Sequence, residues 1–186
     1  MSEALALAAL DVAGAPAQTA KLVKPGDSVL ILGANGKSGV LCGYEAVKRV
    51  GPTGNVVAMV RSKEKGQELL DLGVCHKIII TDATKPVELL EKALEANNGL
   101  EYDISISCVN VESCEMSAIL PVKDHGLVYF FSMATSFTKA ALGAEGIGKD
   151  VTMIVGNGYT KDHAEITLSQ LRESKKIRDL FNNKYI

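Results

Sequence analysis

Residues 28–39 read SVLILGANGKSG, a short apolar run that leads directly into a glycine-rich loop. Residues 40–50 then continue as a helix. A strand, a glycine turn and a helix in this order are the context that a dinucleotide-binding fingerprint requires. The pattern G-x-G-x-x-G has Ala34 in its first position, while Gly36 and Gly39 occupy the other two and Gly33 stands one residue ahead. The stretch therefore predicts a phosphate-binding turn at a helix N-terminus, where free N–H groups face an anion.

Each part of this loop has an expected task. Gly36 is expected to let a pyrophosphate approach the backbone, and Gly39 to let the helix pack closely on the first strand. The cofactor-binding residues predicted here are Gly33, Ala34, Asn35, Gly36, Lys37, Ser38 and Gly39.

Two other interpretations of the loop stay open. Gly36-Lys37-Ser38 resembles the end of a triphosphate-binding P-loop, G-x-x-x-x-G-K-[ST]. That motif needs a glycine five residues before Gly36, where Ile31 stands, and the loop is short for wrapping a triphosphate. The turn is also compatible with a purely structural connection between strand and helix.

The rest of the chain alternates apolar runs with helical patterns. Such alternation predicts right-handed βαβ units and a doubly wound parallel sheet, a Rossmann fold with strand order 3-2-1-4-5-6 and helices on both faces. We expect one dinucleotide-binding domain over residues 1–186, with its core at about 26–157. Strands are predicted at 28–32, 55–60, 77–81, 103–109, 126–133 and 151–155, and helices at 3–12, 40–50, 63–72, 86–97, 112–120 and 163–181. Residues 132–149 form the longest segment that is expected to be irregular.

The composition excludes several classes of protein. A formal net charge of −2 over 186 residues gives no basic face for nucleic acid, and no run is long and apolar enough to span a membrane. The start, Met1-Ser2-Glu3, lacks the basic residues of a secretory signal. The cysteines are scattered without the close pairs typical of metal sites, so we expect reduced thiols, no metal and a cytoplasmic protein; they are Cys42, Cys75, Cys108 and Cys114.

The end of the second strand bears on the cofactor subtype. NAD enzymes of this fold place an acid there to bind the ribose 2′-hydroxyl. Arg61 and Ser62 occupy that region instead, and Lys63 follows. These residues suit a 2′-phosphate, which favours NADP or a tolerance of both dinucleotides. Solvated polar residues at a helix start are the alternative.

Ligands of this fold lie outside the carboxyl ends of the strands. The residues that follow the later strands are therefore predicted to contact the cofactor. They are Asp82 after the third strand, Asn110 after the fourth, Ser132 and Met133 after the fifth, and Asn157 after the sixth.

Segments along the whole chain resemble the medium-chain dehydrogenase/reductase superfamily. The resemblance begins in residues 5–38, which include Lys24-Pro25-Gly26-Asp27 and the glycine loop. Residues 129–137 (YFFSMATSF), 142–146 and 156–159 narrow it to the 3,5-diaminohexanoate dehydrogenase family. That family implies NAD(P)-dependent oxidative deamination of L-erythro-3,5-diaminohexanoate to 5-amino-3-oxohexanoate in anaerobic lysine fermentation.

The resemblance implies further features. Members carry a GroES-like catalytic domain ahead of the Rossmann domain, so either this chain is a shortened form or another chain supplies that half. The region that holds a zinc-ligand cysteine in zinc alcohol dehydrogenases reads Ala9-Leu10-Asp11 here, so no catalytic zinc is expected. Asp11 and Glu145 are the candidate catalytic or substrate-binding acids. The expected partners are a small diamino acid and further copies of the chain.

Two other functions remain open at this point. One is the cofactor domain of another zinc-independent medium-chain reductase, with a quinone or enone as its substrate. The other is a dinucleotide-binding subunit without catalytic activity.

Overall fold

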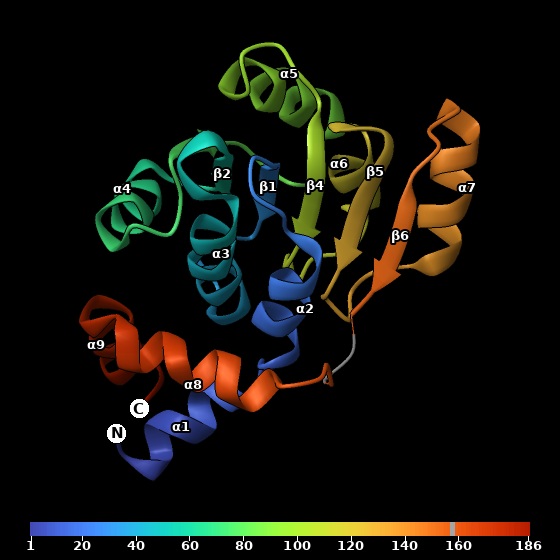
Figure 1. Ribbon diagram of the computed structural model, residues 1–186. Helices are drawn as coiled ribbons and strands as arrows, with labels where there is room; N and C mark the ends of the chain where they lie inside the picture. Colours follow the sequence, from blue (N-terminus) through green and yellow to red (C-terminus); the bar gives the residue numbers. More distant parts are fainter. Residues whose placement is uncertain (157–158) are drawn as a thin grey trace.

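A six-stranded parallel sheet forms the centre of the computed structural model, which describes residues 1–156 and 159–186 (Figure 1). In chain order the elements are α1 (Glu3–Leu10), α2 (Gly14–Leu22), β1 (Ser28–Leu32), α3 (Lys37–Val50), a short 3₁₀ turn (Gly51–Thr53), β2 (Asn55–Val60), α4 (Lys63–Leu72), β3 (Lys77–Ile80), α5 (Pro86–Ala96), β4 (Tyr102–Ser107), α6 (Glu115–Ile119), β5 (Val122–Phe130), α7 (Phe137–Ile147), β6 (Thr152–Val155), α8 (His163–Glu173) and α9 (Lys175–Tyr185).

The strand order is β3-β2-β1-β4-β5-β6, which confirms the predicted doubly wound topology. Val29 of β1 is paired with Val56 of β2 on one side and with Ile104 of β4 on the other. The chain therefore leaves β1 in one direction and later returns on its opposite side. This reversal opens a crevice at the carboxyl ends of β1 and β4, directly beside the glycine loop.

Two apolar cores cover the two faces of the sheet. Alternate residues of β1 divide between them, with Val29 and Ile31 in one core and Leu30 and Leu32 in the other. The first core includes residues of α3, α4, α8 and α9, and the second includes residues of α5, α6 and α7. Both faces of β1 are thus buried, as expected for a central parallel strand.

The N-terminal segment differs from the prediction of one helix over 3–12. Helix α1 ends at Leu10, and a second helix, α2, which the sequence pattern did not predict, runs from Gly14 to Leu22. Gly14 and Pro16 read as helix breakers, yet both lie in the first turn of α2. A proline there loses no intrahelical hydrogen bond, because the first N–H groups of a helix have no partner.

The segment after β5 was predicted to be irregular, and this was wrong. Residues Phe137–Ile147 form α7, whose start is capped by the Ser136 hydroxyl, which accepts a hydrogen bond from the Lys139 N–H. Gly148 ends the helix in a left-handed conformation. A serine cap and a glycine stop are standard helix boundaries that the sequence already contained.

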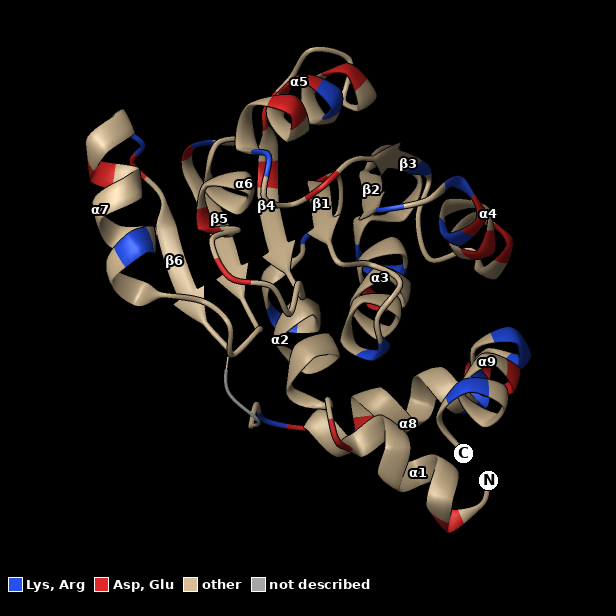
Figure 2. Cartoon of the chain, turned by 180° about the vertical axis from the view of Figure 1, so that it is seen from behind, with Lys and Arg blue, Asp and Glu red and all other residues tan. Residues whose placement is uncertain are grey.

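The predicted C-terminal helix over 163–181 is in fact two helices. Ser174 has extended backbone angles between α8 and α9, and its hydroxyl accepts a hydrogen bond from the Ile177 N–H. This cap lets α9 turn so that Ile177 and Phe181 reach the core. The termini lie near one another in both views, because α1 packs against α9 (Figures 1 and 2).

Strand β5 begins at Val122 and ends at Phe130, whereas the sequence predicted 126–133. The first residues of β5, Lys123-Asp124-His125, are polar and do not give the pattern of a buried strand. The pairing of β5 with β4 contains a register shift. The strand ends early because the N–H groups of Phe131 and Ser132 both point to the Ser107 carbonyl. The chain thereby turns away at the edge where ligands are expected.

Charged side chains of both signs cover the outer helices. Figure 2 shows Lys and Arg interspersed with Asp and Glu over α4, α5 and α9. In the described part of the chain, no helix is long and apolar enough to cross a membrane.

Asp103 ties the start of β4 to β1 and gives a first prediction. Its carboxylate accepts hydrogen bonds from the N–H and the hydroxyl of Ser28 and from Lys123. Burial opposes ionisation of Asp103, but the hydrogen bonds from Lys123 and Ser28 lower its pKa below the usual value. We expect Asp103→Asn to lower the free energy of unfolding at pH 7 by about 2 kcal/mol, the scale of hydrogen bonds to a charged group.

The pH dependence follows from the direction of that shift. A depressed pKa contributes stability above the unfolded value of about 4, and this contribution is lost as the pH falls through the folded pKa. Urea unfolding at pH 7 and at about pH 3 should therefore show the difference between the wild type and Asp103→Asn shrinking in acid. The exposed Glu91→Gln is the matched control. A pH-independent difference would contradict the assignment.

Candidate dinucleotide-binding site

The glycine loop is shaped by contacts that only glycine permits. Gly33 has a φ of +71°, and a Cβ there would lie 2.9 Å from the carbonyl carbon of Cys108. A Cβ on Gly39 would lie 2.4 Å from the Gly33 oxygen and 2.6 Å from the Ala34 Cα. Gly33 thus places the loop against β4, and Gly39 packs the first turn of α3 onto the start of the loop.

Gly36 differs from these two glycines. It is the residue before α3, its backbone is extended, and a Cβ there would meet only the Gly33 oxygen at 3.5 Å, an ordinary contact. The fold itself therefore does not require glycine at this position. The N–H groups of Lys37, Ser38 and Gly39 have no partner within the helix, as in every first helical turn. An anion placed here meets a bare backbone and the positive end of the α3 dipole.

A cleft of about 190 Å³ opens on the β2 side of the loop. It brings together four of the predicted residues: Gly33, Asn35, Arg61 and Asp82. Six further residues line it, and they are Met59, Val60, Ala83, Thr84, Val109 and Val111. Most of these are apolar residues at strand ends. Apolar residues at that position in the sequence could have been used to predict the walls of a pocket for a flat base.

Polar groups at this cleft have defined surroundings. The Asp82 carboxylate accepts hydrogen bonds from the N–H and the hydroxyl of Thr84, which lower its pKa with help from the nearby Arg61 charge. In the described residues, no carboxylate lies within ion-pairing distance of the exposed Arg61 guanidinium. Ser62 caps α4, because its hydroxyl accepts a hydrogen bond from the Lys65 N–H. Arg61 is thus placed to meet an added anion, and Ser62 already has a structural task.

A second cleft of about 380 Å³ opens on the other side of the loop, beyond the carboxyl ends of β4 and β5. It contains the predicted residues Asp11, Ser38, Asn110, Ser132 and Met133. Val12, Cys108, Phe131 and Gly156 complete the lining. The two clefts flank the glycine loop, so most of the predicted residues converge on one edge of the sheet.

Glu145 is not part of this convergence. Glu145 is an exposed residue in the last turn of α7, near the amino end of β6, and it lines neither cleft. Helix α7 runs back along the sheet, which carries Glu145 away from the ligand edge. Asn157 lies outside the residues that the structure describes.

Both ends of the chain contact the loop. The Lys37 ammonium lies 2.9 Å from the Asp11 carboxylate, which follows α1, and 5.2 Å from the centre of the Tyr185 ring in α9. The Lys184 ammonium donates a hydrogen bond of 3.1 Å to the Asn35 carbonyl. The sequence alone could not predict this contact, because Lys184 and Asn35 are 149 residues apart.

Lys184 gives a second prediction. Its removal deletes both a hydrogen bond that holds the loop and a positive charge beside the expected diphosphate. We expect Lys184→Ala to raise the dinucleotide Kd about 3- to 10-fold, the scale of one hydrogen bond. Titration calorimetry measures it, with Lys175→Ala as the matched control, because Lys175 lies in the same helix and pairs only with Asp179 among the described contacts. Equal Kd values for the two variants would contradict the assignment.

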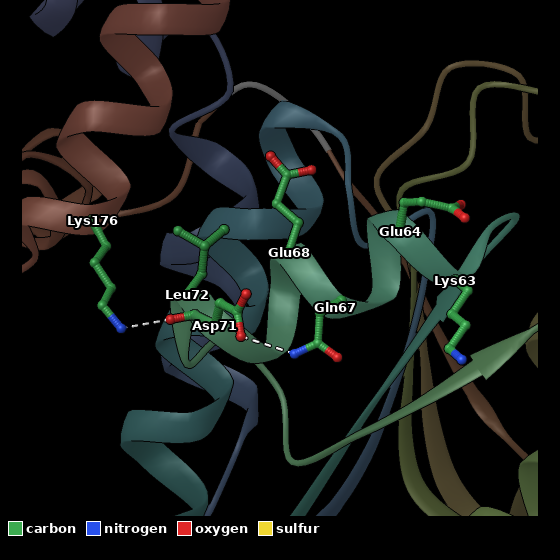
Figure 3. A pocket seen from close by; sticks show the side chains of 7 residues that line it. All are labelled: Lys63, Glu64, Gln67, Glu68, Asp71, Leu72 and Lys176. Atoms are coloured by element: carbon green, nitrogen blue, oxygen red, sulfur yellow. Dashed lines mark hydrogen bonds between the residues drawn. The ribbon is translucent and has the colours of Figure 1, made fainter.

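A wider depression of about 720 Å³ lies over the outer side of α4. Figure 3 shows Lys176 of α9 reaching the end of α4, where its ammonium donates to the Asp71 carbonyl. The Gln67 amide donates to the Asp71 carboxylate. The Lys176 contact joins α9 to α4, whereas the Gln67 contact lies within α4. Lys63, which the sequence analysis grouped with Arg61 and Ser62, lines this depression.

Comparisons with known proteins find two curated dehydrogenases that are similar to the chain. It is 70% identical, over all 186 residues, to the curated L-erythro-3,5-diaminohexanoate dehydrogenase of Acetoanaerobium sticklandii, and 64% identical to that of Fusobacterium nucleatum. The chain resembles diaminohexanoate dehydrogenases throughout. It spans about half, 54%, of the length of these two curated relatives. No family model matches the chain.

Solved structures similar to the chain include alcohol dehydrogenases, a quinone oxidoreductase and an enoyl reductase. The alcohol dehydrogenase TADH from Thermus sp. ATN1 has a TM-score of 0.69 at 21% identity, over 96% of this chain and 52% of that one. A mycobacterial protein complexed with NADPH has a TM-score of 0.66 at 17% identity, over 100% of this chain and 56% of that one. At such identities the likeness concerns the fold.

Proposed function

We propose that this chain is the dinucleotide-binding portion of an oxidoreductase that oxidatively deaminates L-erythro-3,5-diaminohexanoate to 5-amino-3-oxohexanoate. The observation that carries the proposal is the 70% identity over the whole chain to a curated enzyme of that name. The family's place in anaerobic lysine fermentation and in the cytoplasm is part of the same proposal. Free thiols at the cysteines agree with a reducing compartment.

The residues at the carboxyl edge suit a nicotinamide dinucleotide. Gly36 has no side chain, and the first N–H groups of α3 have no partner within the helix, so this part of the loop fits a diphosphate. An added Cβ at Gly36 would crowd that diphosphate. The apolar cleft beside β2 fits the adenosine half, and the cleft beside β5 fits the nicotinamide half. We propose NADP or NAD as the cofactor, with Arg61 as the residue that favours NADP.

The proposed reaction removes a hydride and an ammonium ion from one carbon. The nicotinamide supplies the hydride acceptor. An ammonium substrate, an oxidised dinucleotide and water become a ketone, an ammonium ion, a reduced dinucleotide and a proton. The chain's own contribution is to hold the dinucleotide at the glycine loop and to present its nicotinamide cleft to the substrate. Phe131, Val12 and Met133 give that cleft an apolar wall.

Sequence outside these 186 residues completes the active site in this proposal, either in the same chain or in a partner chain with a GroES-like domain. Homo-oligomers are also part of the proposal. Strand β6 lies at the edge of the sheet and exposes Val155, and an edge strand of this kind readily pairs with another copy.

A direct assay tests the function. The 186-residue chain is titrated with NADPH and NADH to measure binding. The native enzyme that carries the sequence is then given 3,5-diaminohexanoate, and dinucleotide reduction and ammonia release are measured together. Equal amounts of both products are expected. Reduction of quinones or enones without ammonia turnover would instead support another medium-chain reductase. Dinucleotide binding with no turnover on either substrate class would support a non-catalytic subunit.

Asp11 gives a third prediction. Its carboxylate lies at the rim of the nicotinamide cleft, paired with Lys37, and its side chain is 67% exposed. This position suits an ammonium group of the substrate. We expect Asp11→Asn in the native enzyme to lower kcat/KM about tenfold and to alter its pH profile, with less than a threefold change in dinucleotide Kd. Asp179→Asn, an exposed acid of α9, is the control. An unchanged pH profile and turnover would exclude the role.

A further inference from the structure

Two cysteines from different elements meet at the floor of the nicotinamide cleft. The Sγ atoms of Cys42, in α3, and Cys108, directly after β4, lie 4.0 Å apart. A disulfide bond is about 2 Å long, so closing the gap requires an approach of only about 2 Å. The two thiols are 66 residues apart in the chain, and the packing of α3 on the sheet brings them together.

The pair is reachable from one side only. Cys108 lines the cleft and is partly exposed, whereas Cys42 is fully buried behind it. Hydrogen bonding with Cys42 and with Ser38 lowers the pKa of Cys108, and burial raises the pKa of Cys42. An oxidant that enters the cleft therefore contacts the more reactive thiol, Cys108, first, and the Cys42 thiol lies next to it.

The surroundings contain a further unsatisfied group. The Tyr129 hydroxyl is buried and has no hydrogen-bond partner among the described residues. Its pKa is raised by burial and then by the charges of Cys42 and Cys108, which places the phenol beside the same two sulfurs. A buried donor without a partner is costly, and a sulfur that gains charge or oxygen during oxidation is a partner for it.

We propose that Cys42 and Cys108 form a redox-modification site in which a peroxide converts the two thiols to a disulfide that closes the nicotinamide cleft. The Cys108 thiolate attacks one peroxide oxygen, the O–O bond breaks, and the leaving hydroxide takes a proton to become water. The Cys42 thiol then loses its proton, its sulfur attacks the Cys108 sulfur, and the S–O bond breaks to release a second water. The thiols lose two electrons, which reduce one peroxide to two waters.

The disulfide is expected to disturb the proposed dinucleotide site, and this consequence rests on the proposed function. Ser38, which contacts Cys108, lies one turn before Cys42 in α3. Gly33 packs directly on the Cys108 carbonyl. Drawing the two sulfurs together moves α3 against the end of β4, where little free space remains. A bound dinucleotide would in turn cover Cys108 and slow its oxidation.

The experiment treats the reduced chain with hydrogen peroxide, maps its peptides by mass spectrometry and measures NADPH affinity before and after the treatment. We expect a Cys42–Cys108 linkage with the loss of two hydrogens, at least a tenfold loss of affinity, and recovery of both after dithiothreitol. Prior saturation with NADPH should slow linkage formation at least tenfold. Cys42→Ala should keep its affinity after peroxide, whereas Cys75→Ala should behave as the wild type. Cys75 is a suitable control because its thiol is also buried and burial raises its pKa to about 12.

Several outcomes would overturn the proposal. One is the absence of the linkage when peroxide has already oxidised other cysteines. Another is a linked chain whose NADPH affinity changes less than twofold. Linkage mapping in the wild type needs no variant, so a Cys42→Ala chain that fails to fold leaves the test intact. Failure of the reduced chain to bind any dinucleotide would overturn the proposed function instead, and peptide mapping would still report on the disulfide.

Discussion

Gly36→Ala is expected to abolish most dinucleotide binding and to leave the fold intact. The added methyl group meets only an ordinary contact within the protein, and the backbone angles at this position suit alanine. The same methyl group would stand where a diphosphate must touch the backbone of the loop. We expect the Kd for NADPH to rise at least 100-fold, with a change in unfolding free energy below about 0.5 kcal/mol. Fluorescence titration and urea unfolding measure the two quantities.

Two other glycines serve as contrasts. Gly39→Ala places its Cβ against the backbone of Gly33 and Ala34, so both affinity and stability should fall, the latter by about 1–3 kcal/mol. Gly146→Ala has open space in α7 and should leave affinity unchanged while gaining up to about 1 kcal/mol of stability. If Gly36→Ala binds NADPH as tightly as Gly146→Ala does, the loop is only a structural turn.

Arg61→Ala should separate the two dinucleotides. The guanidinium stands at the end of β2, at the rim of the cleft proposed for adenosine, close enough to Asp82 to influence its pKa. A 2′-phosphate at this position gains a charge-assisted contact that a 2′-hydroxyl does not need. We expect the Kd for NADP to rise 30- to 100-fold and the Kd for NAD to change less than threefold.

The control for Arg61 is an arginine away from the cleft. Arg172 pairs with Glu165 on α8, so Arg172→Ala should alter neither affinity. Arg61→Asp extends the test, because an acid at this point is the feature of NAD-preferring enzymes and should favour NAD. Parallel losses for NADP and NAD in Arg61→Ala would remove the basis for assigning a 2′-phosphate to this residue.

The fold was predictable because its signals are local and repeated. Strands β1 and β2 are short apolar runs, and the glycine loop fixes the point at which β1 becomes α3. The helices that escaped prediction carry weaker signals. Pro16 and Gly14 suggest a break in α2, and small residues such as Ala140 and Gly143 soften the pattern of α7. Helix α7 has a capping serine and a terminal glycine, whereas α2 begins after Ala13 without a side-chain cap. A cap residue fixes a helix boundary only where the flanking pattern already indicates a helix.

The candidate site was predictable to the extent that strand ends determine it. Asp82, Asn110 and Ser132 follow strands, so topology alone brings them to one edge. Lys184 and Cys108 could not be found in this way. The contact of Lys184 with the loop depends on the turn at Ser174, and the role of Cys108 depends on its distance from Cys42. Such pairs arise from packing across the sheet, which no single segment encodes.

The meeting of both chain ends at Lys37 has a thermodynamic consequence. Helix termini normally fray independently and at low cost. Here Asp11 beside α1 and Tyr185 in α9 both hold the first residue of α3. Local opening of either end therefore loosens the turn at which an anion would bind, and an anion bound there must in return restrain both ends. The order of the two terminal segments and the affinity of the loop for an anion are therefore thermodynamically coupled, and each raises the other by the same free energy.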